Sequence, residues 1–258
     1  MKENDLSKPP QKINKAEFYD KLVHITTPGY LFLQDQVLDL ISYHNPNPRM
    51  VFDLGAGTGK LLKKILDRYP QAQTLWIDNS EEFLELARNR LAPYSDRVTY
   101  LLMPLEEDWE CHLDSSPDVI LSMLTIHHLE TAEKRDIYRR SYQILEKDGW
   151  FFNIDEMKTF YPDAHQAALT FWLHHIENCE DQIPPDSKAY YEHILSILPR
   201  WKELDIDQPD RRRSKTAGDD LHDALVLQLE WLKDSGFKSV DLFFKFHLWC
   251  LIGGQKPG

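Results

Sequence analysis

The segment VFDLGAGTGKL, residues 51–61, decides the fold of this chain. An apolar run ends near the acid Asp53, turns through the glycines Gly55, Gly57 and Gly59, and continues into a pattern typical of a helix. Because glycine has no Cβ, the backbone there can turn sharply and let a ligand lie against it. The order of strand, glycine turn and helix predicts a nucleotide-sized notch at the edge of a parallel sheet.

The spacing of the acid and the glycines indicates which ligand this notch binds. A dinucleotide-binding turn reads G-x-G-x-x-G, whereas here the third glycine comes one residue early and Lys60 takes its place. The carboxylate of Asp53, two residues before the first glycine, would repel a pyrophosphate but suits the ammonium group of an amino-acid moiety. S-adenosylmethionine carries such an ammonium group, and it is therefore the expected ligand.

Four segments together resemble the class I S-adenosylmethionine-dependent methyltransferases. The D-x-G-x-G-x-G pattern is similar to motif I of that family, and three more segments follow in the family's order: TLWIDNS at 74–80, PDVILSML at 117–124 and LEKDGWFFNI at 145–154. The resemblance runs from about residue 48 to 156 and returns near the C-terminus. It implies an α/β fold with a Rossmann-like, seven-stranded, mostly parallel sheet and an antiparallel C-terminal strand.

The rest of the chain is interpreted around this sheet. Residues 1–13 are polar and predicted to be disordered, and residues 14–258 are expected to form a single methyltransferase domain. The apolar spacing over 15–44 predicts two helices before the first strand. Residues 157–220 are aromatic and punctuated by prolines, which predicts a helical lid over the ligand edge of the sheet, and one helix of this lid is expected to end before Pro199. The alternation over 239–254 predicts a closing pair of antiparallel strands.

The resemblance implies a set of cofactor-binding residues. Asp53 is expected to hold the ammonium group, and Asp78, at the end of the second strand, the ribose hydroxyls. Pro104 stands where many family members have an acid that binds the adenine amino group, so the adenine contacts are expected to be mainly apolar. The expected cofactor-binding residues are Asp53, Gly55, Ala56, Gly57, Gly59, Asp78, Asn79, Met103, Leu105 and Met123.

Candidate catalytic residues follow the fourth and fifth strands, where the family places its acceptor. His127 is a candidate general base, because the ordinary pKa of histidine is about 6.5. Packing beneath the cofactor is the competing interpretation of this residue. Asp155 and Glu156 are expected within reach of an acceptor hydroxyl or amine, and capping of the next helix is their alternative role. The expected substrate-binding residues are Tyr19, His128, Trp172, His175 and Arg213.

No metal site is predicted. His174 and His175 are neighbours on a predicted helix and cannot face one point, and the offsets to His165 and Glu177 do not assemble one convincing face. The three cysteines lack C-x-x-C spacing, so neither a zinc site nor a disulfide framework is indicated.

The composition limits which binding partners and which cellular location are expected. The formal net charge of −12 opposes a large nucleic-acid substrate, since nucleic-acid binding depends on basic groups. No apolar run approaches the roughly 18 residues that a membrane span needs, and no signal-peptide core is visible at the start. We therefore expect a cytoplasmic monomer or homodimer that acts on a small-molecule acceptor.

The leading hypothesis is methyl transfer from S-adenosylmethionine to an oxygen or nitrogen atom of a small molecule, and several alternatives stay open. The C-terminal third is similar to carboxy-S-adenosylmethionine synthases, in which an arginine matching Arg213 binds the extra carboxylate, although motif I has the generic methyltransferase form. A tRNA-modifying enzyme is opposed by the acidic charge. A non-catalytic regulator that binds S-adenosylmethionine is the alternative from a different class.

Overall fold

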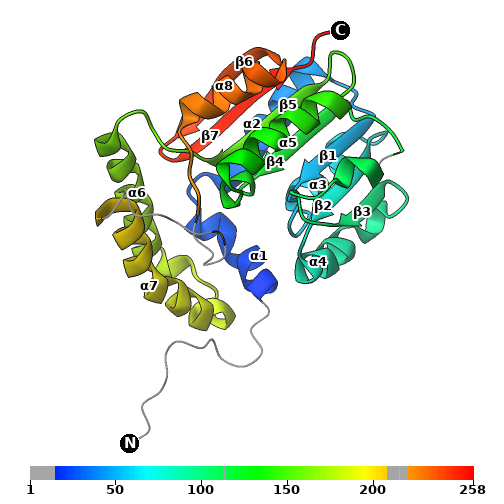
Figure 1. Cartoon of the computed structure of the whole chain (residues 1–258). Coiled ribbons are helices and arrows are strands. Elements are labelled where there is room, and N and C mark those ends of the chain that lie inside the picture. Colours follow the sequence, from blue (N-terminus) through cyan, green and yellow to red (C-terminus); the bar gives the residue numbers. More distant parts are fainter. Residues whose placement is uncertain (1–14, 113, 208–214, 216–219) are drawn as a thin grey trace, which may run out of the picture.

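The computed structural model describes residues 15–112, 114–207, 215 and 220–258. The segment expected to be disordered, residues 1–13, and the candidate substrate residue Arg213 therefore lie outside the described residues. Figure 1 shows a twisted sheet with helices on both faces and a separate group of helices beside one edge of the strands.

The sheet has seven strands in the order β3-β2-β1-β4-β5-β7-β6. All neighbouring strands are parallel except at β7, which is antiparallel to both β5 and β6. This confirms the predicted Rossmann-like sheet and its closing antiparallel pair. The strands are β1 (Met50–Leu54), β2 (Gln73–Asp78), β3 (Val98–Leu102), β4 (Val119–Met123), β5 (Trp150–Glu156), β6 (Lys238–Phe246) and β7 (Trp249–Gln255).

Helices cover the two faces of the sheet, because successive side chains of a strand point to opposite faces. Phe152 of β5 packs with one apolar cluster, which includes residues of α2, α3 and α4, and its neighbour Phe151 packs with the other, which includes residues of α5 and α8. These helices are α2 (Tyr30–His44), α3 (Lys60–Arg68), α4 (Glu81–Leu91), α5 (Thr131–Ile144) and α8 (Leu225–Ser235).

The order of the strands reverses between β1 and β4. The chain leaves β1 toward β2 and β3 on one side, and β4 and β5 lie on the other side. Ligands of open α/β sheets bind at such a reversal, outside the carboxyl ends of the strands. The loops after β1, β2, β4 and β5 therefore surround the candidate site.

The segment predicted as a lid, residues 157–220, contains α6 (Pro162–Glu177) and α7 (Lys188–Lys202), and α1 (Lys15–Thr26) packs with these two helices (Figure 1). Aromatic stacking holds the group together: Phe18 stacks on Tyr190 with ring centroids 5.3 Å apart, and Trp172 stacks on Trp201 at 5.2 Å. The indole N–H of Trp172 also donates to the carbonyl of Thr26 at 3.0 Å. The aromatic side chains of α6 and α7 thus pack these two helices against each other and against α1.

The lid differs from the sequence prediction at Pro199. The sequence predicts a helix that breaks at this proline, but α7 continues through it and passes into a π-helical turn at Glu203–Asp207. Proline removes one backbone N–H and clashes with the preceding turn, which explains a change of helical geometry here. None of the helices within the described ranges is both long and apolar enough to span a membrane.

Candidate active site

The glycine turn after β1 forms an open cradle. The N–H groups of Gly55 and Ala56 donate to the carbonyl of Ile77 at 2.8 and 2.9 Å, which ties the turn to the end of β2. A Cβ on Gly55 would lie 2.1 Å from the side chain of Thr125, whereas a Cβ on Gly57 would meet nothing within 4 Å. Gly55 therefore allows close packing, and Gly57 leaves room for a ligand.

Asp53 lies at the bottom of this cradle. Its side chain is buried, and it lines a small cavity together with Ala56, Tyr30 and Lys60. Burial, with a smaller contribution from the charge of Asp78, raises the pKa of the Asp53 carboxyl well above its ordinary value. A buried carboxylate is costly without a positive partner, and the ammonium of an amino-acid moiety would supply one. Asp53 thus fits the role that the sequence predicts.

Asp78 holds the glycine turn from the other side. Its Oδ2 accepts the N–H of Gly57 at 2.9 Å, and its Oδ1 accepts the N–H of Ser80 at 3.0 Å. The hydroxyl of Ser80 caps α4 by accepting the N–H of Phe83 at 3.2 Å. Asp78 is therefore fixed at the rim of the main cavity, in the position expected for ribose binding.

The main cavity has a volume of about 330 Å³ and lies beside the cradle. Asn79, Leu105 and Met123 line it, as the sequence predicts. Met103 instead packs against the core cluster on the α5 and α8 face, and Gly59 starts α3 close to Leu91. These two predicted cofactor residues support the site and lie outside the lining of the cavity.

A salt bridge that the sequence does not predict closes one rim of this cavity. Glu106 and Lys215 both line it, and the Lys215 ammonium lies 2.7 Å from Glu106 and 2.8 Å from Glu133. Lys215 belongs to the segment before α8 and Glu133 to α5. The link joins the segment before α8 to the loop after β3 and to α5.

Asp20 of α1 provides a second link to the cofactor loop. Its carboxylate accepts the hydroxyl of Thr58 at 2.5 Å and pairs with Arg90 at 2.7 Å and Lys60 at 3.5 Å. Burial alone would raise the pKa of Asp20, but these donors outweigh it and lower the pKa. The sequence contains no motif for this contact, because its four members come from α1, the glycine turn, α3 and α4.

A second cavity, of about 310 Å³, lies between the lid helices and the ends of β4 and β5. The predicted substrate residues Tyr19, His128 and Trp172 line it. Tyr19, His128 and Leu124 line the main cavity as well, so the two cavities adjoin at these side chains. The lining also includes the aromatic residues Tyr190 and Trp201 and the polar residues His127, Glu156 and Asp220.

His127 is held by Asp155. Its ring Nδ1 lies 2.6 Å from Oδ1 of this carboxylate, and its backbone N–H donates to Oδ2 at 2.8 Å. Burial alone would lower the pKa of His127, but the charge of Asp155 outweighs it and raises the pKa to about 9. With Nδ1 bound to Asp155, the Nε2 atom is the one that is available to a ligand.

Two predictions for this region require correction. The sequence predicts Asp155 within reach of an acceptor, but its side chain is completely buried behind His127 and also accepts the N–H of Glu156. His175 was expected in the substrate site, but its Nε2–H donates to the carbonyl of Ile25 at 2.7 Å, and it lines a separate apolar groove beside Phe246.

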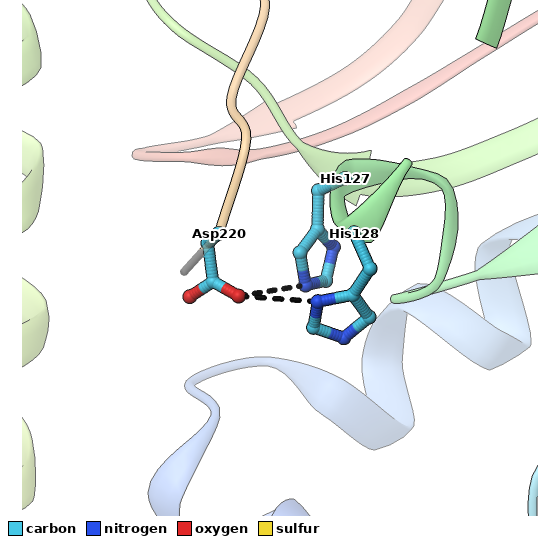
Figure 2. A group of neighbouring side chains, drawn as sticks. All are labelled: His127, His128 and Asp220. Carbon is cyan, nitrogen blue, oxygen red and sulfur yellow. Dashed lines mark ion pairs between the residues drawn. The ribbon is translucent and has the colours of Figure 1, made fainter. Parts of the chain in front are cut away.

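Asp220 lines the polar end of the second cavity and His222 contacts Glu156, which lines it as well; no pattern in the sequence predicts either residue. Figure 2 shows Asp220 facing the imidazole rings of His127 and His128. The Nε2 atom of His222 lies within hydrogen-bond distance of Oε2 of Glu156, at 3.0 Å. The segment from Asp220 to Asp223 has no recognisable motif, and only the fold brings it to the end of β4.

Comparison with known proteins gives consistent results. A family model described as a methyltransferase domain matches residues 51–149. The chain is 47% identical over 201 residues to a trans-aconitate 2-methyltransferase of Acidovorax sp. (strain JS42), covering 75% of this chain and 70% of the relative. It is 27% identical over 169 residues to a carboxy-S-adenosyl-L-methionine synthase of Campylobacter lari, and this match covers 64% of this chain and 70% of the relative.

Two solved structures share the fold. An O-methyltransferase family protein from Burkholderia thailandensis has a TM-score of 0.57 at 16% identity, covering 97% of this chain and 65% of that one. Human N-acetylserotonin methyltransferase, solved with its cofactor, has a TM-score of 0.57 at 14% identity, and the match covers 95% of this chain and 56% of the human chain. This chain thus spans less than two thirds of the length of either solved chain.

A Rossmann-like sheet that ends in an antiparallel pair, with a glycine cradle over a buried aspartate, defines a nucleoside-binding transferase of the methyltransferase type. The chain belongs to the class I S-adenosylmethionine-dependent methyltransferases. S-adenosylmethionine is accordingly its methyl donor, and the cradle and main cavity contain the residues that would bind it.

Proposed function

We propose that this enzyme methylates an oxygen or nitrogen atom of a small-molecule acceptor that binds in the lid cavity. The observation that carries the proposal is the junction of the two cavities at Tyr19, Leu124 and His128. A donor in the main cavity and an acceptor in the lid cavity would meet there. S-adenosylmethionine supplies an activated methyl group, so the protein has mainly to align the acceptor and exclude water.

Each part of the chain has a defined task in this proposal. Asp53 holds the ammonium group of the cofactor and Asp78 its ribose hydroxyls, and the aromatic walls of the lid at Trp172 and Trp201 bury the apolar part of the acceptor. The polar end of the cavity, at His127 and Glu156, orients the hydroxyl or amine that receives the methyl group. A cavity of about 310 Å³ suits a small molecule.

The names of the relatives agree with a small acceptor. One curated relative is a trans-aconitate 2-methyltransferase, and another, 30% identical over 118 residues, is an ornithine lipid N-methyltransferase of Singulisphaera acidiphila. The second name specifies nitrogen and the first specifies no atom, so they support the acceptor class and leave the methylated atom open.

Labelled S-adenosylmethionine tests this proposal. The protein is incubated with the donor and a cell extract separated into a small-molecule and a macromolecular fraction, and the Asp53→Asn variant serves as the inactive control. We expect label in the small-molecule fraction when the unmodified protein is used, and no label in that fraction with the Asp53→Asn variant. Label confined to the macromolecular fraction, or to neither fraction, would contradict the proposal.

A carboxy-S-adenosylmethionine synthase-like activity is the second candidate, because several curated relatives carry that name. Calorimetry with S-adenosylmethionine and its carboxylated form distinguishes the two. A methyltransferase is expected to prefer the unmodified donor, whereas a synthase would bind its carboxylated product more tightly.

A further inference from the structure

The polar end of the lid cavity gathers imidazole and carboxylate groups from three separate segments. His127 and His128 follow β4, Glu156 ends β5, and Asp220 and His222 precede α8. Figure 2 shows the first two residues directed at the carboxylate of Asp220. The fold has therefore assembled a set of donor atoms that no linear pattern in the sequence contains.

The distances within this cluster suit ligands of a single ion. Oδ1 of Asp220 lies 3.7 Å from Nε2 of His127 and 3.2 Å from Nδ1 of His128. One donor atom from each of the three residues lies within 4.8 Å of the other two. Imidazole nitrogens and carboxylate oxygens bind Zn²⁺ at about 2.0–2.2 Å, so donor atoms at such separations need only a small rotation of the exposed His128 to share one ion.

The contact behind His127 is one that metal-binding histidines commonly make. Its Nδ1 is bonded to Asp155 at 2.6 Å, which leaves Nε2 directed at Asp220. A carboxylate behind a histidine fixes the tautomer and the ring orientation and raises the basicity of the ligand nitrogen. The ring is thus preorganised before any ion binds.

The segment that carries Asp220 is also fixed in place. The N–H of Leu221 donates to the carbonyl of His127 at 2.9 Å. Lys134 of α5, whose side chain is fully buried, donates to Asp223 at 2.8 Å and to the carbonyl of Leu221. These bonds join the Asp220 segment to the histidines and to α5, so the three donor groups meet as parts of one structure.

We propose that His127, His128 and Asp220 bind one divalent transition-metal cation of the kind that prefers imidazole, such as Zn²⁺ or Fe²⁺. Two histidines and one carboxylate leave coordination positions open, and an acceptor oxygen or nitrogen can occupy one. The Glu156 and His222 pair lies beside Asp220 and belongs to a second group of close donors. The binding of the ion is independent of methyl transfer, whereas its effect on the acceptor rests on the proposed function.

Metal titration of the full chain tests this site without any acceptor. The protein is first treated with a chelator and then titrated with Co²⁺, whose visible absorption reports its ligands, and Zn²⁺ is used to displace it. We expect a single ion per chain. The variants Asp220→Asn and His128→Ala should each weaken binding by about tenfold or more. His174→Ala, which removes an exposed histidine of α6, is the matched control and should bind as the unmodified protein does.

Calorimetry with S-adenosylmethionine accompanies each variant. Its affinity should stay unchanged in Asp220→Asn, because Asp220 lines the lid cavity and not the main cavity, and this result shows that the fold and the cofactor site survive the substitution. His128 lines both cavities, so a thermal unfolding transition like that of the unmodified protein is the fold control for His128→Ala. The proposal is overturned if Co²⁺ gives no change in absorption, or if the cluster variants and the His174→Ala control bind it equally. Either result leaves the labelling experiment for methyl transfer unaffected, so the two proposals fail separately.

Discussion

The Nδ1 atom of His127 lies 2.6 Å from Oδ1 of Asp155, and the backbone N–H of the same histidine donates to the other oxygen at 2.8 Å. One completely buried carboxylate therefore fixes both the ring and the backbone of the residue at the polar end of the lid cavity. Asp155 comes from β5 and His127 from the turn after β4, so the parallel pairing of these strands creates the contact.

Replacing Asp155 by asparagine should disturb the acceptor side and leave the donor side intact. The Asp155→Asn variant is expected to lower kcat by about tenfold to a hundredfold, because the ring of His127 loses its fixed orientation. Its affinity for S-adenosylmethionine should not change. Asp118→Asn, just before β4 at the opposite end of the strands, is the control and should retain kcat. A parallel loss of donor affinity in Asp155→Asn would contradict a positioning role.

Two glycines of the cradle should respond differently to the same substitution. Gly55→Ala places a methyl group 2.1 Å from Thr125, so we expect a loss of folding stability together with donor binding. Both glycines have a positive φ, which strains alanine at either position, but Gly57→Ala meets no protein atom within 4 Å, so it should lose less stability than Gly55→Ala and place its methyl group inside the cofactor cavity. Thermal unfolding and calorimetry on both variants separate the effects. Unchanged donor affinity in Gly57→Ala would show that the space beside Gly57 is not reserved for a ligand.

Asp53 should favour binding at the expense of stability. Its raised pKa means that the folded protein resists ionising this group, so the stability of the unliganded protein falls as pH rises above the ordinary carboxyl value of about 3.9. Asp53→Asn removes that cost and should raise the melting temperature near neutral pH, while donor affinity falls by about tenfold or more. A variant that is less stable and still binds the donor would contradict the assignment.

Asp20 should show the opposite dependence on pH. Its pKa is lowered in the folded protein, so its contribution is present above the ordinary carboxyl pKa and is lost as pH falls through the folded value. We expect Asp20→Asn to cost about 1 kcal/mol at neutral pH, a modest amount because the charges are partly exposed, with the difference vanishing in acid. Asp186→Asn, which breaks the exposed pair with Lys21, is the control and should change stability little.

Most of the sheet and the cofactor side could be predicted from the sequence. The glycine turn, Asp53 and Asp78 form a local pattern, and local patterns are visible without a structure. The alternation of apolar residues likewise predicts the strands and the closing antiparallel pair. Pro199 is an exception, because α7 continues through this proline although a proline ordinarily ends a helix.

The acceptor side could be predicted only in part. His127 and Glu156 follow strands that the sequence identifies, but Asp220 and His222 reach them only through tertiary contacts of a segment without a motif. His175 has the right residue type in the right helix, yet helix rotation turns it to the carbonyl of Ile25. Side-chain direction within the lid depends on how the helices pack, and composition does not encode that.

A crystal structure with S-adenosylhomocysteine is the most direct test of the central claim. We expect its amino group beside Asp53, its ribose beside Asp78 and its sulfur at the junction of the two cavities, next to Tyr19 and His128. The sulfur would then face the lid cavity. A sulfur atom directed away from that junction, or a product bound outside the cradle, would contradict the account.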